Sequence, residues 1–276
     1  MTSVLITGAS RGIGRAAALR LDRKGFDVIA GVRSEEAGRA LAAEASDRLR
    51  VVQIDVADEA SVRAAAETVG DRLDVLVNNA GIAVGGVIEA LPLADLRHQL
   101  EVNVVGQVAV TQALLPALRA TSGRIVFISS VSGRASVPAL TPYAASKFAI
   151  EAIADGLRVE LRAWGIDIVL VEPGSIDTDI WRAGEAQLDT TVAAMSDEHR
   201  RLYGPLLEGT RKVVAQTAKR AAPVDKVAEV IEEAMTASRP RARYVVGLDA
   251  RIQIGLRTLL PARAFDAVLA RMMGVR

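Results

Sequence analysis

The chain of 276 residues contains no cysteine. Without thiols, a disulfide, a zinc site with cysteine ligands and a thiolate nucleophile are all excluded. The two histidines, His98 and His199, lie far apart in the chain, so a histidine-rich metal site is not expected either. Neither sign of charge dominates, with 34 Lys and Arg against 33 Asp and Glu, and no strong basic stripe of the kind that nucleic-acid-binding proteins carry is present.

Long apolar runs are also missing. The first apolar run, residues 4–6, is far too short for the hydrophobic part of a signal peptide or for a membrane span. We therefore expect a cytoplasmic protein. Hydrophobic residues make up 50% of the chain, which is enough for a large core, and we expect residues 1–276 to form a single domain.

Short apolar segments alternate with longer segments that have helical periodicity. Strands are predicted over residues 4–7, 27–32, 50–54, 75–77, 124–129, 166–171 and 244–246, and helices over 12–24, 35–46 and 224–237. Strands that alternate with helices of this length form βαβ units around a parallel sheet. The pattern predicts an α/β fold: a Rossmann-type, doubly wound parallel sheet with helices on both faces.

Two segments depart from this alternation. Residues 175–223 have no regular strand pattern, and we expect a partly helical lid that closes over a pocket; the alternative is a solvated insertion without a role. The apolar side chains expected to line the pocket are Trp181, Leu188, Met195, Leu202 and Tyr203. Residues 248–276 mix apolar residues with arginines, and we expect a C-terminal extension that packs on its own domain or on a partner subunit. The alternative for this segment is contact with a membrane surface.

A glycine-rich turn, Thr-Gly-Ala-Ser-Arg-Gly-Ile-Gly at residues 7–14, follows the first strand and opens the first helix. Glycines allow a tight turn and let a pyrophosphate approach the backbone, where the helix N-terminus presents free N–H groups. The spacing is Gly-x3-Gly-x-Gly rather than the G-x-G-x-x-G fingerprint, and a simple strand–helix connection is the alternative. The same residues match the hydrolase motif G-x-S-x-G with Ser10 as nucleophile. No earlier strand supplies an oxyanion loop, which disfavours a hydrolase.

The residues after the second strand bear on the choice of cofactor. Arg33 stands there and no acidic residue precedes Glu35, while Arg11 in the glycine turn can reach the same region. An acidic side chain would bind the ribose hydroxyl of NAD, whereas arginines accommodate the 2′-phosphate of NADP. We therefore predict NADP(H), with NAD(H) as the second candidate. The alternative for Arg33 is a surface residue without a ligand.

Further motifs follow in order along the chain. They are Asp55-Val56, Asn78-Asn79-Ala80-Gly81, the set Asn103, Ser130, Tyr143 and Lys147, and Pro173-Gly174 with Thr178. Together with the glycine turn, this series resembles the short-chain dehydrogenase/reductase family over most of the chain, and its steroid- and retinol-dehydrogenase branch in particular. The predicted cofactor contacts are Gly8, Ser10, Arg11, Gly12, Ile13, Gly14, Arg33, Asp55, Val56, Asn79, Ala80, Gly81, Tyr143, Lys147, Pro173, Gly174, Ile176 and Thr178.

The catalytic chemistry can be argued from residue spacing. Tyr143 and Lys147 are four residues apart and share one helix face, so we expect the ammonium to lower the pKa of the phenol. Tyr143 would then exchange a proton with the substrate oxygen, and Ser130 would hydrogen-bond that oxygen. The resemblance further implies that Lys147 holds the nicotinamide ribose and that Asn103 shapes a helix bend and a water path. The predicted reaction interconverts a carbonyl and an alcohol.

The substrate is less constrained by the sequence. The resemblance and the long lid suggest a small, lipophilic alcohol or ketone. The resemblance also implies a homodimer or homotetramer that pairs through residues 96–118 and 143–164. A competing hypothesis is a sensor that binds NADP(H) without turnover. It predicts loss of the tyrosine or the lysine, yet Tyr143 and Lys147 are both present.

Overall fold

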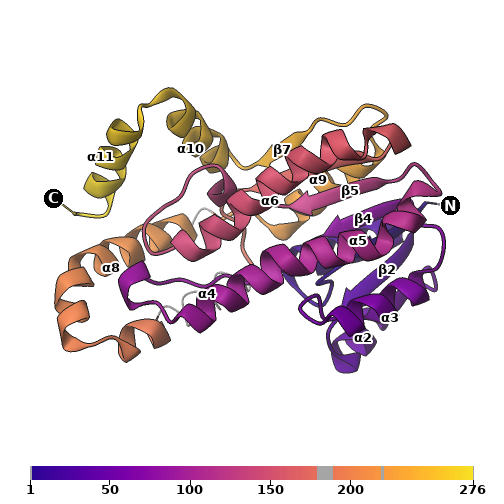
Figure 1. Ribbon diagram of the computed structural model, residues 1–276, viewed down its shortest axis with the longest axis horizontal. Helices are drawn as coiled ribbons and strands as arrows, with labels where there is room; N and C mark the ends of the chain where they lie inside the picture. Colours follow the sequence, from indigo (N-terminus) through magenta and orange to yellow (C-terminus); the bar gives the residue numbers. More distant parts are fainter. Residues whose placement is uncertain (1, 179–188, 219–220, 276) are drawn as a thin grey trace.

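A computed structural model describes residues 2–178, 189–218 and 221–275 (Figure 1). Its seven-stranded sheet has the order β3-β2-β1-β4-β5-β6-β7, and every neighbouring pair is parallel. The strands are β1 (Ser3–Ile6), β2 (Asp27–Val32), β3 (Leu49–Gln53), β4 (Val75–Asn78), β5 (Arg124–Ile128), β6 (Asp167–Pro173) and β7 (Arg243–Val246). The predicted α/β fold is confirmed.

Helices connect the strands. They are α1 (Gly12–Arg23), α2 (Glu35–Ala42), α3 (Glu59–Val69), α4 (Leu93–Leu100), α5 (Gly106–Arg119), α6 (Thr141–Glu160), α8 (Asp197–Ala218), α9 (Val224–Thr236), α10 (Leu248–Leu259) and α11 (Ala262–Met272). Four short helical turns are η1 (Ile88–Ala90), η2 (Glu101–Val105), η3 (Val131–Gly133) and η4 (Arg162–Trp164). Among these turns, η2 is π-helical and joins α4 directly to α5.

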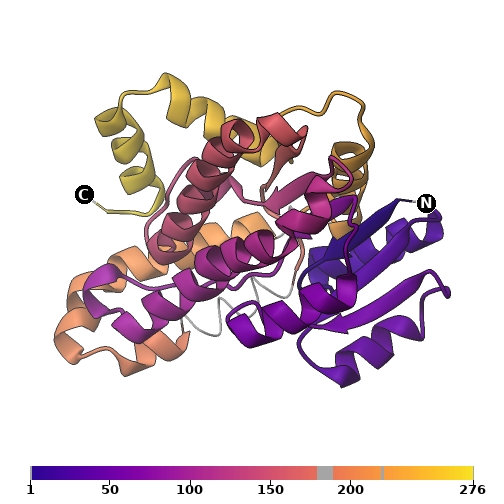
Figure 2. The ribbon, with the colours of Figure 1, turned by 45° about the vertical axis from the view of Figure 1, so that its right-hand side comes forward.

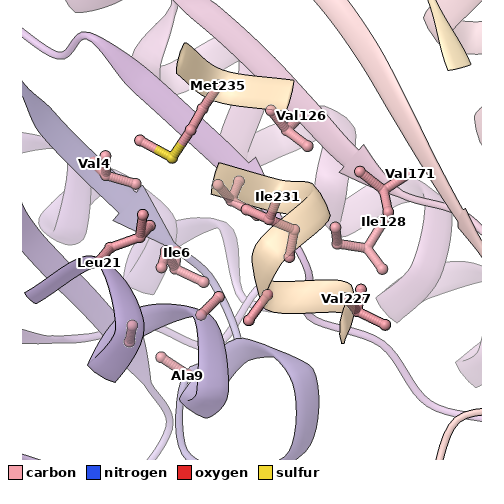
Figure 3. Packing of buried hydrophobic residues seen from close by; sticks show 14 of the residues in the cluster. Val4, Ile6, Ala9, Leu21, Val126, Ile128, Val171, Val227, Ile231 and Met235 are labelled. Atoms are coloured by element: carbon pink, nitrogen blue, oxygen red, sulfur yellow. The ribbon is translucent and has the colours of Figure 1, made fainter. Parts of the chain in front are cut away.

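The two faces of the sheet carry separate hydrophobic cores. Successive strand residues point to opposite faces, so Val4 and Ile6 enter one core and Leu5 enters the other. Figure 3 shows the first core, in which α1 and α9 cover Val4 and Ile6 together with Val126, Ile128 and Val171. The helices α3, α5 and α6 cover the second core.

From β1, the strands β2 and β3 follow on one side of the sheet, and the chain then crosses to the other side of β1 with β4. In a parallel sheet, the carboxyl ends of all strands lie along one edge, and the loops that leave β1 and β4 diverge there to opposite faces. A crevice at such a reversal is the usual ligand-binding place of open α/β sheets. The glycine turn after β1 and the Asn-Asn-Ala-Gly segment after β4 both meet at this point.

The predicted lid is more regular than its sequence suggests. Residues 189–194 are helical, and α8 is a helix of 22 residues with Pro205 inside it. Figures 1 and 2 both place α8 beside α4 at one end of the molecule. An isolated bridge between Ile176 and Ala222 holds the two ends of the segment together. The expected helical content of the segment is confirmed in the described residues, and the helix α8 continues through Pro205.

Few of the expected lid residues face a pocket. Met195 and Leu207 are buried in a small cluster with Val87 and Ala139, outside the two main cores. Tyr203 packs against this cluster and donates a hydrogen bond to Glu89. Leu202 was predicted to line the pocket, but it is 56% exposed because it lies on the outward side of α8. Trp181 and Leu188 lie outside the described residues.

The C-terminal extension forms α10 and α11. Phe265 and Met273 of this extension are buried, and the sulfur of Met273 lies 3.6 Å from Thr210 Oγ1 of α8. At the start of α10, Asp249 Oδ2 accepts a hydrogen bond of 2.8 Å from the backbone N–H of Ser175. The extension therefore packs on its own chain at both ends. No helix in the described residues is both long and apolar enough to cross a membrane.

Candidate active site

The glycine turn after β1 is built by close backbone contacts. Gly8 has φ +67, and a Cβ on it would lie 2.9 Å from Ala80 Cα. A Cβ on Gly14 would lie 2.4 Å from both Asn79 Nδ2 and the Gly8 carbonyl oxygen. The Asn79 amide donates to the carbonyl oxygens of Thr7 (2.9 Å) and Gly8 (3.2 Å). The segment after β4 thus fixes the turn after β1.

This turn leaves room for an anion. The first residues of α1 receive no side-chain cap from Arg11, so their N–H groups are open to a ligand. Apart from the neighbouring backbone, Thr178 is the only residue in the described part of the chain within 4 Å of a Cβ built on Gly12, at 3.8 Å, so a side chain there would meet little. A helix N-terminus with free N–H groups and a partial positive charge is suited to a pyrophosphate. The residues present therefore fit a dinucleotide cofactor.

One cleft collects most of the predicted site. It is lined by Gly8, Ser10, Arg11, Gly12, Ile13, Gly31, Arg33, Ile54, Asp55, Val56, Ala57, Asn79, Ala80, Gly81, Ile82, His98, Val102, Ile128, Ser129, Ser130, Tyr143, Lys147, Pro173, Gly174, Ile176 and Thr178. Of the predicted residues, Gly14 and Asn103 are buried and do not line the cleft. Within the described ranges, no three His, Cys, Asp or Glu side chains are grouped to hold a metal ion.

Two arginines mark one end of this cleft. Arg11 and Arg33 are both exposed and both line the cleft. The backbone of Arg33 is held where β2 ends, because Gln53 of β3 donates from Nε2 to its carbonyl oxygen at 3.1 Å. On the same side, Asp55 Oδ1 accepts a hydrogen bond of 3.0 Å from the Ala57 N–H, which fixes the turn after β3.

Tyr143 lies near the other end of the cleft, in the first turn of α6. It is 7% exposed, and burial raises the pKa of its phenol to about 12, while a hydrogen bond with Ser130 acts in the opposite direction. The expectation that Lys147 lowers this pKa was wrong, because burial of the phenol raises it. The phenol is therefore protonated at neutral pH, which is the form required of a proton donor.

Lys147 lies one turn further along α6. Its Nζ donates a hydrogen bond of 2.7 Å to the carbonyl oxygen of Ile128, at the end of β5. The ammonium lies 5.6 Å from the centre of the Tyr143 ring. Burial lowers the pKa of Lys147 to about 8, and the charge of Glu151 opposes that change. The lysine is thus mostly charged at neutral pH and close to the point where it loses its proton.

Asn103 supports this arrangement from the π-helical turn η2. Its Oδ1 accepts from the Ile82 N–H at 2.8 Å, and its Nδ2 donates to the Ile82 carbonyl at 2.9 Å and to Ser146 Oγ at 3.0 Å. Ser146 Oγ in turn donates to the Tyr143 carbonyl oxygen at 2.7 Å. Asn103 therefore joins the loop after β4 to the first turn of α6.

Some contributors to the site were missed from the sequence. Ser146 stands directly before Lys147, and Glu151 follows Lys147 by one helical turn, so the helix periodicity could have indicated both. His98 of α4 lines the cleft, but no spacing or motif marks it. Glu172 of β6 is completely buried, and only its acidic character inside an apolar strand gave a signal.

The sheet order, the glycine turn at a helix N-terminus and the buried tyrosine and lysine are features of a Rossmann-type, dinucleotide-dependent oxidoreductase. Comparison with known proteins specifies the family. The family model for short chain dehydrogenase matches residues 2–189. The chain belongs to the short-chain dehydrogenase/reductase family.

Its similar relatives span almost its whole length. An NADPH-dependent 3-dehydrocapnine reductase from Ornithobacterium rhinotracheale is 37% identical over 97% of this chain and 96% of its own. The mouse (Mus musculus) retinol dehydrogenase 16 is 36% identical over 96% of this chain and 87% of its own. A solved short-chain dehydrogenase from Streptomyces avermitilis superimposes with a TM-score of 0.77 at 30% identity, covering 99% of this chain and 95% of that one. The chain therefore resembles the retinol-dehydrogenase-like branch.

Proposed function

We propose that the protein is an NADPH-dependent reductase that converts a lipophilic ketone or aldehyde to an alcohol. The main support is one observation: a buried, protonated Tyr143, hydrogen-bonded with Ser130, lies in the cleft that also carries Arg11 and Arg33. The proposed proton donor and the two arginines proposed to bind phosphate thus lie in the same cleft. The competing hypothesis of a sensor without turnover finds no support in the comparisons.

The choice of NADPH rests on charge. Two exposed guanidiniums at the end of β2 and in the glycine turn suit a 2′-phosphate, which they can bind through charge-assisted hydrogen bonds. The 37% identical relative is named as NADPH-dependent. The actinorhodin polyketide ketoreductase, solved with NADPH, is 27% identical with a TM-score of 0.73 over 89% of this chain and 95% of its own.

The residues of the site divide the reaction between them. NADPH, when bound, supplies a hydride to the carbonyl carbon. Tyr143 gives its phenolic proton to the carbonyl oxygen, so that an alcohol forms. Ser130 donates a hydrogen bond to the same oxygen and stabilises its developing negative charge. The Lys147 ammonium stabilises the phenolate that remains, and Asn103 keeps Tyr143 in register through Ser146.

A lipophilic substrate is proposed from two features. Ile82, Val102 and Ile176 are among the apolar side chains that line the cleft. The relatives that include retinol dehydrogenases match this chain over 96% of its length. These features support an apolar ketone or aldehyde over a charged one.

We also propose one domain and a homo-oligomer. A single sheet draws strands from residue 3 to residue 246, and α11 packs back on α8. Large apolar side chains remain exposed on and beside α5 and α6, at Val105, Phe148, Val159 and Trp164. Such a surface is suited to the face of a second copy. Light scattering after size-exclusion chromatography tests this: a monomer at micromolar concentration would contradict it.

The function is tested by a screen of ketones, aldehydes and alcohols of graded size with NADPH and NADH, followed by absorbance. We expect oxidation of NADPH with apolar carbonyl compounds and much weaker activity with NADH. The Tyr143→Phe variant is the matched control for contaminating activity. Binding of NADPH without turnover of any carbonyl compound would favour the sensor hypothesis instead.

A further inference from the structure

The two C-terminal helices, α10 and α11, expose apolar side chains in an ordered pattern. On α10 these residues follow a spacing of four, four and three, which places them on one face of the helix. They are Leu248, Ile252, Leu256 and Leu259, with exposed fractions of 73%, 54%, 41% and 82%. Apolar residues exposed singly are normal on a protein surface, whereas a continuous stripe of them indicates a contact surface.

The second helix repeats the pattern. Val268, Met272 and Val275 are exposed at spacings of four and three, on α11 and just after it. Another side of each helix packs within the chain, where Ala250 and Phe265 are buried. Figures 1 and 2 show both helices projecting at the edge of the molecule, beyond the sheet. The inward sides are thus already in use, and the exposed stripes remain for a partner.

The same segment concentrates positive charge. Residues 248–276 contain five arginines against two aspartates, although the whole chain has a net charge of only +1. Elsewhere in the described residues arginines pair with carboxylates, as Arg211 does with Asp189. In those same residues, no carboxylate forms an ion pair with any of the four exposed arginines of the extension, which are Arg251, Arg257, Arg263 and Arg271. Their charge is therefore open to a partner.

This charge decides which partner fits the surface. A second copy would bring its own arginines against these, because a two-fold interface places the same patch on both sides and like charges repel. A bilayer with anionic lipids offers phosphates for the guanidiniums and an apolar boundary for the exposed side chains. At 12 and 11 residues, α10 and α11 are too short to cross a bilayer, so they are suited to lie along its surface.

Both helices are also joined to the segments around the cleft. Asp249, next to Leu248, accepts a hydrogen bond from the Ser175 N–H, and the preceding Gly174 lines the cleft. At the other end of the extension, a Cβ on Gly209 of α8 would lie 2.9 Å from Met273 Cα. A surface bound by α10 and α11 is thus connected through the chain itself to the cleft and to α8.

We propose that α10 and α11 form a docking surface for a bilayer that contains anionic lipids. The exposed apolar side chains of both helices enter the boundary between headgroups and acyl chains, and the arginines beside them bind lipid phosphates. This contact goes beyond the proposed function, since it requires neither cofactor nor turnover. It gives a reductase of lipophilic compounds access to substrates dissolved in the bilayer.

The first test is co-sedimentation of the full chain with vesicles. We expect binding to phosphatidylcholine vesicles that contain about one third phosphatidylglycerol, much weaker binding to pure phosphatidylcholine, and release at about 1 M salt, where charges are screened. Leu259→Asp should weaken binding at least about tenfold, because a large apolar side chain no longer leaves water. Arg251→Glu should weaken it about fivefold or more.

Matched controls change similar side chains elsewhere. Leu93→Asp alters an apolar residue of α4 that is 61% exposed, and Arg48→Glu reverses an exposed arginine just before β3. Both variants should bind the anionic vesicles like the wild type. All four substituted side chains are exposed, so we expect the variants to fold, and thermal unfolding checks this.

The absence of cysteine allows a second measurement with a site-specific probe. Leu259→Cys, labelled with an environment-sensitive fluorophore, should show a blue shift of its emission when anionic vesicles are added. Leu93→Cys, labelled in the same way, should show no shift. This readout reports entry of position 259 into the bilayer and does not depend on the effect of an introduced charge.

Equal sedimentation with and without anionic vesicles would overturn the proposal, as would an equal loss in Leu93→Asp or an unchanged emission of the probe at position 259. If light scattering shows an oligomer in the wild type that Leu259→Asp dissociates, α10 and α11 contact a second copy and the proposal is wrong. None of these readouts uses NADPH turnover, so failure of the proposed function would leave the docking result standing.

Discussion

The two halves of the cleft are built on different physical principles. At the cofactor end, around β1, β2 and β3, the charged groups Arg11 and Arg33 are exposed and the shape comes from glycines and backbone contacts. At the catalytic end, around β5, α6 and β6, the ionisable groups are buried and the pKa values of Tyr143, Lys147 and Glu172 are displaced from their ordinary values. Binding a phosphate requires accessible charge, whereas proton transfer depends on an environment that sets proton affinity.

Tyr143→Phe should have the largest effect and should separate the two halves. The phenol is the proposed proton donor, while the ring only packs, so kcat should fall about 10²–10⁴-fold. NADPH affinity, measured by fluorescence titration, should stay near that of the wild type. Retention of more than about a tenth of the activity would show that Tyr143 is not the donor.

Arg33→Ala should act in the opposite way, on binding rather than on kcat. Loss of a charge-assisted contact costs about 1.5–3 kcal/mol, so NADPH should bind about 10–150-fold more weakly. NADH affinity should change little, because NADH lacks the 2′-phosphate. Arg39→Ala, on the exposed face of α2, is the control. If Arg33→Ala weakens both cofactors equally, the arginine does not select between them.

Glu172→Gln tests the effect of a buried carboxyl on the pH dependence of stability, at a residue that takes no part in the proposed reaction. The pKa of Glu172 is raised from 4.5 to about 7, so its proton stabilises the folded state fully below pH 4.5, and this contribution is lost as the pH rises through about 7. The neutral glutamine cannot show this loss. We expect the free energy of unfolding of the wild type to decline relative to the variant between pH 4.5 and pH 7.

Urea unfolding at stepped pH measures this difference. The exposed Glu160→Gln, on the last turn of α6, should leave the pH dependence of the wild type intact. Parallel stability curves for wild type and Glu172→Gln would show that Glu172 is ionised throughout this range.

Leu202→Ala should have the smallest effect. The side chain lies on the outer side of α8, so its removal should change the free energy of unfolding by less than about 0.5 kcal/mol. Met195→Ala, in the buried cluster beside α8, should cost about 2–5 kcal/mol by the usual range for buried methionines. Thermal unfolding compares the two. Equal losses would mean that α8 is packed differently from the described arrangement.

The sequence predicted best where local signals are strong. The strand β2 was predicted with its observed bounds, and most of the other strands to within one residue, because each is a short apolar run closed by turn residues. The glycine turn and the Tyr-x3-Lys spacing were also recognised in the sequence, and their residues line one cleft in the structure. The helices α10 and α11 were described only as an extension, since alternating arginines and apolar residues hid their periods.

What escaped prediction depends on long-range contact. Arg243 is hydrogen-bonded to Glu151, which is 92 residues away in the sequence, and no local sequence pattern predicts such a pair. The pKa of Tyr143 was predicted in the wrong direction because spacing along a helix gives the neighbouring charge but not the burial. Sequence periodicity therefore predicted which side chains are neighbours within one helix or strand. The burial of those side chains, and their contacts with residues far away in the sequence, could be read only from the folded chain.

The hydrogen bond between Asp249 and the Ser175 N–H ties the C-terminal extension to the segment that follows β6, where Gly174 lines the cleft. A Cβ on Gly174 would lie 2.6 Å from Asp249 Oδ1, so residues 174 and 249 share one small space although they are 75 positions apart. Substitutions at these two positions are therefore expected to be epistatic. A chimera that exchanges the chain after Gly247 for the tail of a relative inherits this constraint, and it needs residues 174 and 175 of the same donor.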